Sequence, residues 1–331
     1  MEAITKTSMY HLFRADPLRL PKTVDTEGLV WIEPTPDLIV GDIKEYAQRN
    51  QVAPARIAGY WFGSRLPLTK NEKIIYELHG GAYVLGDASP VNYLGNVDLC
   101  KGLLMHNQQF TRAFQLEYRL SQGPPLPSEN PFPAALIDAV AGYHYLVKVM
   151  GFNPSNILLV GESAGAGLAI TLLRYLIQHV PSLPPPAATL LVSPGADWGT
   201  SHWGPHSSVA THISSDFIGP FHGGYPARAF VGDMLLDEVE TNPWISPASK
   251  YLQKGDRWFQ DFPPTLIVTG GMEMLLDANR YLRERMRADM GDRLAAFEIE
   301  SGTHMFMNFT WQEPERTEGL KRVAKWLSAV M

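Results

Sequence analysis

A serine flanked by small residues is the group in this sequence best suited to nucleophilic chemistry. Gly161-Glu162-Ser163-Ala164-Gly165 directly follows the apolar run 156–160 and directly precedes the helix-like run 164–179. A serine in a sharp strand-to-helix turn needs neighbours without bulky side chains, because its backbone sits in a strained region. Its hydroxyl then lies at a helix N-terminus, where the dipole favours developing negative charge. This placement, more than the five-residue pattern alone, predicts that Ser163 is a nucleophile.

Two adjacent glycines upstream supply the groups that would stabilise such a reaction. His79-Gly80-Gly81-Ala82 follows the apolar run 73–78. Glycines leave their backbone N–H groups uncovered, so we predict that Gly80, Gly81 and Ala164 form an oxyanion hole for a tetrahedral intermediate. Losing one such donor typically lowers the rate by about 100- to 1000-fold. We expect His79 to brace this loop through a backbone hydrogen bond rather than to act as a base.

The catalytic base is expected late in the chain. In hydrolases with this type of serine turn, the order along the chain is nucleophile, acid and then histidine. His304 ends the run Ser301-Gly302-Thr303-His304, directly after the strand-like run 296–300. Among the ten histidines it alone has this placement. We therefore predict that His304 takes the proton from Ser163.

Two acidic residues compete for the third position. Glu273 and Asp277 both follow the strand-like run 265–269, four residues apart. Either carboxylate could orient His304 and stabilise its imidazolium form. A glutamate has one methylene more than the usual aspartate, and the loop would have to accommodate it. The residue types and spacing leave both candidates open.

Strands and helices that could position these residues alternate along most of the chain. Short runs rich in Ile, Val and Leu, bounded by Gly or Pro, read as buried strands at 73–79, 113–118, 156–160, 189–193, 265–269 and 296–300. Helix-like stretches lie at 92–105, 134–150, 164–179, 278–290 and 315–330. This alternation predicts one doubly wound α/β domain with a mostly parallel sheet. Residues 58–63 should add an antiparallel strand at its edge.

Two segments do not fit the alternation. Residues 1–50 precede the first predicted strand, with weak helical patterns around 9–14 and 35–49, and residues 195–255 interrupt the sheet. We interpret them as parts of one cap over the carboxyl edge of the sheet, where open α/β proteins bind ligands. The chain, 1–331, is then a single domain. Its catalytic core comprises 51–194 and 256–331.

Composition excludes several classes of protein. The 34 acidic residues outnumber the 28 basic ones, so no global positive field attracts nucleic acid. The sequence contains no run of about 18 uncharged apolar residues, so it predicts no membrane span. Cys100 is the single cysteine, and residues 1–23 lack the apolar core of a signal peptide. These features predict a cytoplasmic protein.

Four histidines in the predicted cap raise the question of a metal. His202, His206, His212 and His222 lie within 21 residues of one another. Their spacing lacks partner carboxylates in a recognisable ligand pattern. We therefore predict neither a metal nor a cofactor.

Several ordered blocks together carry a family resemblance. Besides the glycine loop and the serine turn, they are Tyr118-Arg119-Leu120, Pro131-Phe132-Pro133-Ala134-Ala135-Leu136 with Asp138, Ser193-Pro194 and Ser246-Pro247. Over roughly residues 73–328 the sequence resembles the hormone-sensitive-lipase-like family of α/β-hydrolases, the esterases with an HGGG loop. Ala82 replaces the last glycine of that loop, and residues 122–126 resemble an insertion.

The resemblance has consequences for fold and site. It implies an α/β-hydrolase fold, with a mostly parallel central sheet flanked by helices and a helical cap formed by the N-terminal segment and an insertion after the sixth strand. In the family the acid loop usually reads Asp-Pro-Leu-x-Asp and its first acid is the triad member, which favours Glu273 over Asp277. Similar enzymes often form homodimers, a state that stays open for this chain.

The expected function is hydrolysis of a small or medium acyl ester, acetyl esters included, with the ester and water as partners. The same triad could serve a thioesterase, a lactonase or an acyl-transferring hydrolase, and the blocks are similar to hydrolases of natural-product biosynthesis. A different class is a non-catalytic small-ligand receptor, since gibberellin receptors share this fold and keep the serine. They lack the catalytic histidine, whereas this chain has His304.

Overall fold

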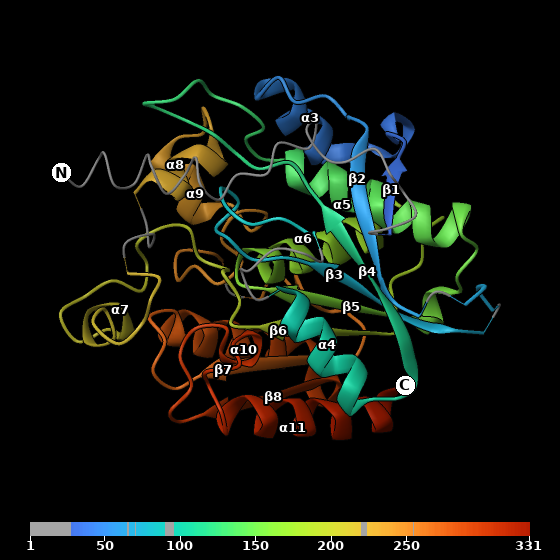
Figure 1. Cartoon of the computed structure of the whole chain (residues 1–331). Coiled ribbons are helices and arrows are strands. Elements are labelled where there is room, and N and C mark those ends of the chain that lie inside the picture. Colours follow the sequence, from blue (N-terminus) through green and yellow to red (C-terminus); the bar gives the residue numbers. More distant parts are fainter. Residues whose placement is uncertain (1–27, 65, 70, 90–95, 220–223, 254) are drawn as a thin grey trace.

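The computed structural model describes residues 28–64, 66–69, 71–89, 96–219, 224–253 and 255–331 (Figure 1). The helical pattern expected around residues 9–14 lies outside the described residues. So do the first positions of the helix expected at 92–105.

One sheet of eight strands forms the centre of the described structure. The strands are β1 (Leu29–Ile32), β2 (Ile57–Gly63), β3 (Lys73–Leu78), β4 (Phe110–Glu117), β5 (Ile157–Glu162), β6 (Ala188–Val192), β7 (Thr265–Gly270) and β8 (Leu294–Ile299). Their order across the sheet is β1-β2-β4-β3-β5-β6-β7-β8. Strand β2 pairs antiparallel with both β1 and β4, and the other neighbouring strands are parallel. This is the mostly parallel sheet that the alternation predicts.

The edge of the sheet differs from the expectation. Strand β2 is antiparallel as predicted, but β1 covers it, with Leu29 opposite Tyr60 and Ile32 opposite Ile57. The prediction that β2 is the edge strand is therefore wrong. So is the assumption that no strand lies within residues 1–50. The sequence of β1 is only Leu-Val-Trp-Ile, a run too short to distinguish from a buried helical turn by its pattern.

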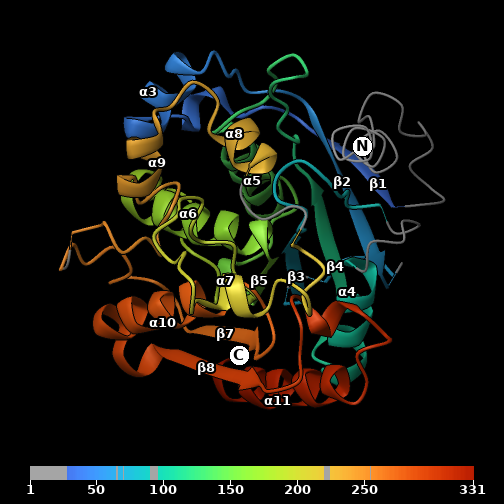
Figure 2. The same ribbon diagram turned by 90° about the vertical axis from the view of Figure 1, so that its left-hand side faces the viewer.

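Helices cover both faces of the sheet. One face carries α5 (Ala134–His144), α6 (Ala164–His179) and α10 (Leu276–Met290), and the other carries α4 (Asn96–His106) and α11 (Glu315–Val330) (Figures 1 and 2). Side chains of a strand alternate between the two faces. Accordingly Tyr76 of β3 packs with the α5 side, and Ile75 packs with α4 and α11.

The helix boundaries mostly match the pattern. Helices α6 and α11 have the predicted bounds, whereas the helix expected at 134–150 ends as α5 at His144 and continues as a π turn, Tyr145–Val149. The remaining elements are α3 (Gly41–Arg49), α7 (Ser208–Thr211), α8 (Tyr225–Val231), α9 (Leu236–Thr241) and the 3-10 turns Pro36–Leu38, Pro154–Asn156, Gly291–Arg293 and Phe306–Asn308. Among the helices of the described ranges, none combines the length and apolar character needed to cross a bilayer.

The two predicted cap segments contact each other. Helices α7, α8 and α9 of the second segment gather at one end of the sheet, and α3 of the first segment lies beside α9 (Figures 1 and 2). Arg49 Nη1 lies 2.8 Å from Glu238 Oε1, and Trp244 Nε1 donates to Asp42 Oδ2 over 3.0 Å. Segments separated by about 190 residues in the chain are thus joined through polar side chains.

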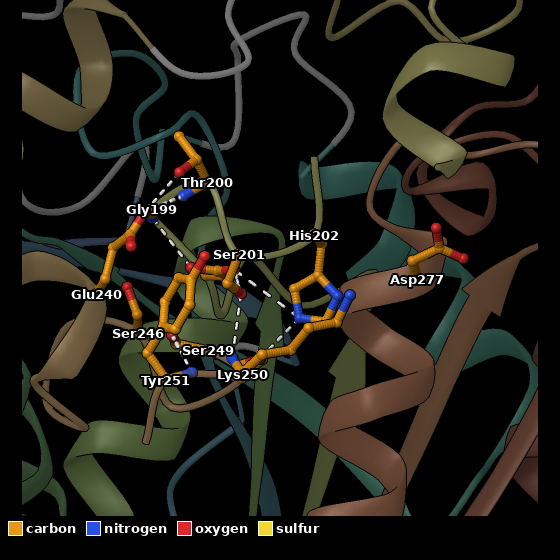
Figure 3. A network of polar contacts seen from close by, with 12 residues as sticks. Gly199, Thr200, Ser201, His202, Glu240, Ser246, Ser249, Lys250, Tyr251 and Asp277 are labelled. Atoms are coloured by element: carbon orange, nitrogen blue, oxygen red, sulfur yellow. Dashed lines mark hydrogen bonds and ion pairs between the residues drawn. The ribbon is translucent and has the colours of Figure 1, made fainter. Parts of the chain in front are cut away.

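Short polar contacts also fix the beginning of the second segment. Figure 3 shows Thr200 against Glu240, and Ser201 beside Lys250. Thr200 Oγ1 donates to Glu240 Oε1 over 2.6 Å, and the Lys250 backbone N–H donates to Ser201 Oγ over 3.1 Å. These bonds join the two ends of a segment that contains only short helices.

A buried ion pair near the end of β4 supports a stability prediction. Asp138, which is 1% exposed, accepts hydrogen bonds from the backbone and the guanidinium of Arg119, both at 2.8 Å. Replacing Asp138 by alanine leaves the Arg119 guanidinium without its partner, so we expect the free energy of unfolding to fall by about 3–5 kcal/mol. Urea denaturation followed by circular dichroism measures this change.

Arg322→Ala is the matched control. It breaks an ion pair with Glu318 in which both side chains are half exposed, and it should change the free energy of unfolding by less than about 1 kcal/mol. Equal losses in the two variants would contradict the structural role assigned to Asp138.

Candidate active site

Ser163 stands in a strained turn between β5 and α6. Its backbone has φ 52° and ψ −118°, a region that non-glycine residues rarely occupy. The turn requires close backbone contact, because a Cβ on Gly161 would lie 2.4 Å from the Gly165 carbonyl oxygen. A Cβ on Gly165 would lie 2.0 Å from the carbonyl oxygen of Leu78. The two flanking glycines are therefore what allows this turn to form.

His304 lies in the loop after β8 and reaches the serine. Its Nε2 atom is 2.8 Å from Ser163 Oγ, although the two residues are 141 positions apart in the chain. The side chain of His304 is 1% exposed. The loop is held by the next residue, Met305, whose N–H donates to Ser193 Oγ over 3.0 Å. The hydrogen bond has the length needed for transfer of the serine proton.

The structure separates the two candidate acids. Glu273 Oε2 lies 3.3 Å from His304 Nδ1, and the Glu273 side chain is fully buried. Asp277 lies in the first turn of α10 and accepts a hydrogen bond from the Ser208 N–H over 2.8 Å. Asp277 thus attaches the short cap helix α7 to α10, while Glu273 is the acid beside the imidazole.

The glycine loop follows β3 and approaches the serine closely. A Cβ on Gly80 would lie 3.2 Å from Ser163 Cβ. The Gly80 N–H donates to Glu162 Oε1 over 3.3 Å, so it already has an acceptor within the protein, which the predicted oxyanion role did not anticipate. Gly81 has φ +112°, and a Cβ there would clash with the Leu85 carbonyl oxygen at 2.1 Å. Ala164 begins α6, where the first N–H groups of a helix have no acceptor within the helix.

The carboxylate of Glu162, at the end of β5, connects two loops. Besides Gly80, it accepts a hydrogen bond from Asn308 Nδ2, in the segment that follows His304. Burial raises the pKa of Glu162 to about 7, although the bonds from Asn308 and Gly80 favour its charged form. Glu77 is also buried, and burial, together with the nearby charge of Glu162, raises its pKa well above the usual range. Glu162 therefore positions the loops around Ser163 and does not itself contact it.

His79 braces the glycine loop, as predicted. Its Nδ1 atom is 2.7 Å from the Gly80 carbonyl oxygen, and its ring stacks on Tyr118 with 4.1 Å between ring centroids. Burial lowers the pKa of His79 to about 4, so the ring stays neutral near neutral pH. The imidazole within hydrogen-bonding distance of Ser163 Oγ is that of His304.

The cap histidines have separate surroundings. His202 Nε2 is 2.8 Å from the Ala248 carbonyl oxygen, in the contact network of Figure 3. His222 lies outside the described residues. Within the ranges that the structure describes, no group of three or more His, Cys, Asp or Glu side chains is placed to share a metal ion.

Two residues beside the acid were not identified from the sequence. Asn279 Nδ2 donates to Glu273 Oε1 over 2.9 Å, and Asp216 Oδ2 accepts from the Met274 N–H over 2.7 Å. Asn279 lies only six residues after Glu273, in the helix that follows the acid loop. This short separation along the chain is the signal that could indicate it as a partner of the acid. Asp216 lies 58 residues from Met274, and no local pattern could have indicated its role.

The comparisons with known proteins agree with this geometry. A family described as having the alpha/beta hydrolase fold matches residues 75–308, well over half of the chain. The chain belongs to this family. An acetyl-hydrolase of Streptomyces hygroscopicus is 30% identical to this α/β-hydrolase, over 78% of this chain and 75% of its own. An esterase of Acinetobacter venetianus is 27% identical, over 85% and 82%.

A solved structure gives the same result. A homologue of hormone-sensitive lipase from a metagenome library superposes with a TM-score of 0.66 at 25% identity, over 98% of this chain and 92% of its own. The sequence resemblance to the hormone-sensitive-lipase-like esterases is thereby confirmed. This α/β-hydrolase is a carboxylic ester hydrolase.

The positions of the two acids lead to a pair of opposite predictions. Glu273→Gln keeps the size of the side chain but removes the charge beside His304, so kcat/KM for a simple ester should fall by about 10⁴-fold. Asp277→Asn should change kcat/KM little, since its carboxylate faces Ser208. Steady-state kinetics on both variants, after a check of folding by circular dichroism, measures the difference. A larger loss in Asp277→Asn would contradict the assignment of the acid.

The surroundings of His304 also predict the pH profile. Burial alone would lower the pKa of His304, but the Glu273 carboxylate, helped by Asp216 and Glu162, raises it above its ordinary value near ~6.5. A base must be neutral to accept a proton, so kcat/KM should decline as the pH falls through a value above ~6.5. Asp216→Asn removes one nearby negative charge and should shift this decline to lower pH.

A control variant separates this local effect from a general one. Asp277→Asn removes a carboxylate that is bonded to the cap and should leave the acid limb of the pH–kcat/KM profile in place. If both variants shift the limb equally, the shift does not come from the Asp216 charge beside His304.

Proposed function

We propose that this α/β-hydrolase is a serine esterase that cleaves small or medium acyl esters, acetyl esters included, through an acyl-enzyme intermediate. The observation that carries the proposal is the linear arrangement of Ser163, His304 and Glu273. The imidazole lies between the two, with Nε2 2.8 Å from the serine oxygen and Nδ1 3.3 Å from the carboxylate. This order of nucleophile, base and acid is typical of enzymes that transfer acyl groups.

In the first half-reaction, Ser163 Oγ attacks the ester carbonyl carbon while its proton passes to His304 Nε2. The carbonyl π electrons move to the oxygen, which becomes the oxyanion of a tetrahedral intermediate. We assign its stabilisation to the N–H groups of Gly81 and Ala164, and we give Gly80 the role of holding the loop through Glu162. When the intermediate collapses, the C–O bond to the alcohol breaks and His304 gives its proton to the departing oxygen.

In the second half-reaction, water takes the place of the alcohol. His304 removes a proton from the water as its oxygen attacks the acyl-enzyme carbonyl. Collapse of the second intermediate releases the carboxylic acid, and the proton on His304 returns to Ser163 Oγ. Glu273 stabilises the imidazolium formed in each half-reaction.

A small acyl group is supported by the aromatic residues on the side of the glycine loop. Tyr83 stacks on Phe230 with 3.9 Å between ring centroids, and Trp198 lies 5.3 Å from each of them. Tyr83 and Phe230 are 2% and 4% exposed, so these rings are packed against each other and leave little room there. One relative is named an acetyl-hydrolase, and acetyl is a small acyl group.

We also propose that α3 and residues 195–255 form one cap on a single catalytic domain. The ion pair between Arg49 and Glu238 and the bond between Trp244 and Asp42 support this. The attachment of Asp216 to the Met274 N–H connects the cap to the loop that carries Glu273. The cap would then shape the substrate site and hold the acid at the same time.

Replacing the nucleophile tests the proposal. Ser163→Ala should retain the fold and lower the hydrolysis of p-nitrophenyl acetate by about 10⁴-fold or more, because no oxygen remains to form the acyl-enzyme. A fluorophosphonate probe should label the wild type on Ser163 and leave the variant unlabelled, as measured by intact mass and peptide mapping. Ser328→Ala, which changes an exposed serine on α11, is the matched control.

The outcomes also distinguish the alternative functions. Retained activity in Ser163→Ala would contradict the proposed mechanism. A wild type that neither turns over esters nor reacts with the probe would support a receptor. Faster acyl-enzyme formation from matched thioesters or lactones than from oxygen esters would identify a thioesterase or lactonase with the same triad.

A further inference from the structure

A strip of aromatic side chains begins at the catalytic histidine and leads to the surface. The Phe217 ring lies 5.9 Å from the His304 ring, centroid to centroid, and Phe309 meets Phe217 edge-on at 5.3 Å. Trp311 stacks on Phe309, also at 5.3 Å. His304 is 1% exposed, whereas Phe217 is 44% and Trp311 64% exposed, and Phe309 between them is partly buried. Two large rings are thus open to solvent, one of them directly beside His304.

The proposed chemistry determines which part of an ester faces this strip. His304 Nε2 must deliver its proton to the leaving oxygen, so the group attached to that oxygen departs past the imidazole. The glycine loop, which Tyr83 directly follows, approaches Ser163 closely, and we assign the acyl group to this side. Phe217, which contacts the imidazole ring, therefore borders the alcohol part of the substrate.

The strip is held in place from two distant parts of the chain. Phe217 follows Asp216, whose buried carboxylate accepts the Met274 N–H over 2.7 Å. Phe309 and Trp311 belong to the segment after the 3-10 turn Phe306–Asn308, where Gln312 Oε1 accepts a hydrogen bond over 3.4 Å from the N–H of Thr303, the residue before His304. Because each side of the strip is tied to a neighbour of the catalytic residues, its rings keep their position relative to His304.

We propose, building on the serine esterase function above, that Phe217, Phe309 and Trp311 form a binding strip for the alcohol part of the ester. Exposed aromatic rings that adjoin one another favour a flat apolar partner, which contacts their faces and edges as it leaves water. The strip thus selects esters of arylmethyl or similar flat alcohols over esters of short alkyl alcohols. Each ring contributes about 3- to 10-fold to this preference.

Two acetate esters test the preference. Ethyl acetate and 2-naphthylmethyl acetate share an acyl group and have alcohols of similar acidity, so their difference reports binding of the alcohol more than leaving-group ability. The wild type should show the higher kcat/KM on the naphthylmethyl ester. Phe217→Ala and Trp311→Ala should each lower kcat/KM for this ester by about 3- to 10-fold and leave that for ethyl acetate nearly unchanged.

Controls separate binding of the alcohol from general damage. Tyr251→Ala removes an equally exposed ring of the cap outside the strip and should change neither value. Phe217→Tyr keeps the ring and should retain the preference. 2-Naphthylmethanol should inhibit the wild type competitively, and its inhibition constant should rise in Phe217→Ala and in Trp311→Ala.

Three results would overturn the proposal. One is an equal loss on both esters in both variants, which would indicate a structural role. Another is a wild type that is labelled by the fluorophosphonate and hydrolyses both esters without preference. The third is a fall in kcat/KM of the two variants for ethyl 2-naphthylacetate, which carries the ring on its acyl side, together with an unchanged kcat/KM for 2-naphthylmethyl acetate. A wild type without labelling or turnover would instead contradict the serine esterase function itself, so the two failures are distinguishable.

Discussion

The site depends on one backbone constraint, the strained turn that carries Ser163. A serine at φ 52° is unfavourable by itself, by about 1–3 kcal/mol, and persists only where the surrounding structure determines it. Gly161 and Gly165 allow the strand, the helix and the end of β3 to approach within distances that any Cβ would prevent. Ser163, the first turn of α6 and the glycine loop therefore occupy fixed positions relative to one another.

Buried carboxylates organise the loops around this turn. Glu162 accepts hydrogen bonds from the glycine loop and from the segment after His304, while Glu273 is held between His304 and Asn279. Such charges are costly to bury unless donors surround them. The consequence is that the position of each loop depends on the others, since each provides donors that the carboxylates require.

The proposed cap has residues on two sides of Ser163. Trp198 and Phe230 pack on Tyr83, next to the glycine loop, whereas Phe217 stands beside the imidazole of His304. Asp216 attaches the same segment to the loop of the triad acid. Under the proposed function, substrate preference and the alignment of the proposed triad would depend on this same segment. A substitution in this segment would therefore alter the positions of Glu273 and His304.

The sequence by itself determined the features that depend on local pattern: the alternation of strands and helices, the bounds of α6 and α11, the serine turn and the loop position of His304. Strand β1 has only four apolar residues, which define no period, so the sequence does not predict it. Without β1, residues 58–63 are predicted as the edge strand. The residue types and spacing leave Glu273 and Asp277 open and the family resemblance favours Glu273, whereas the tertiary structure places Glu273 beside His304 and Asp277, in the first turn of α10, against Ser208. It also decided that Glu162 accepts hydrogen bonds from the Gly80 N–H and from Asn308, that Asp216 accepts one from the Met274 N–H, and that the Phe217 ring lies beside that of His304. These contacts join residues 58 to 146 positions apart, and no local preference encodes them.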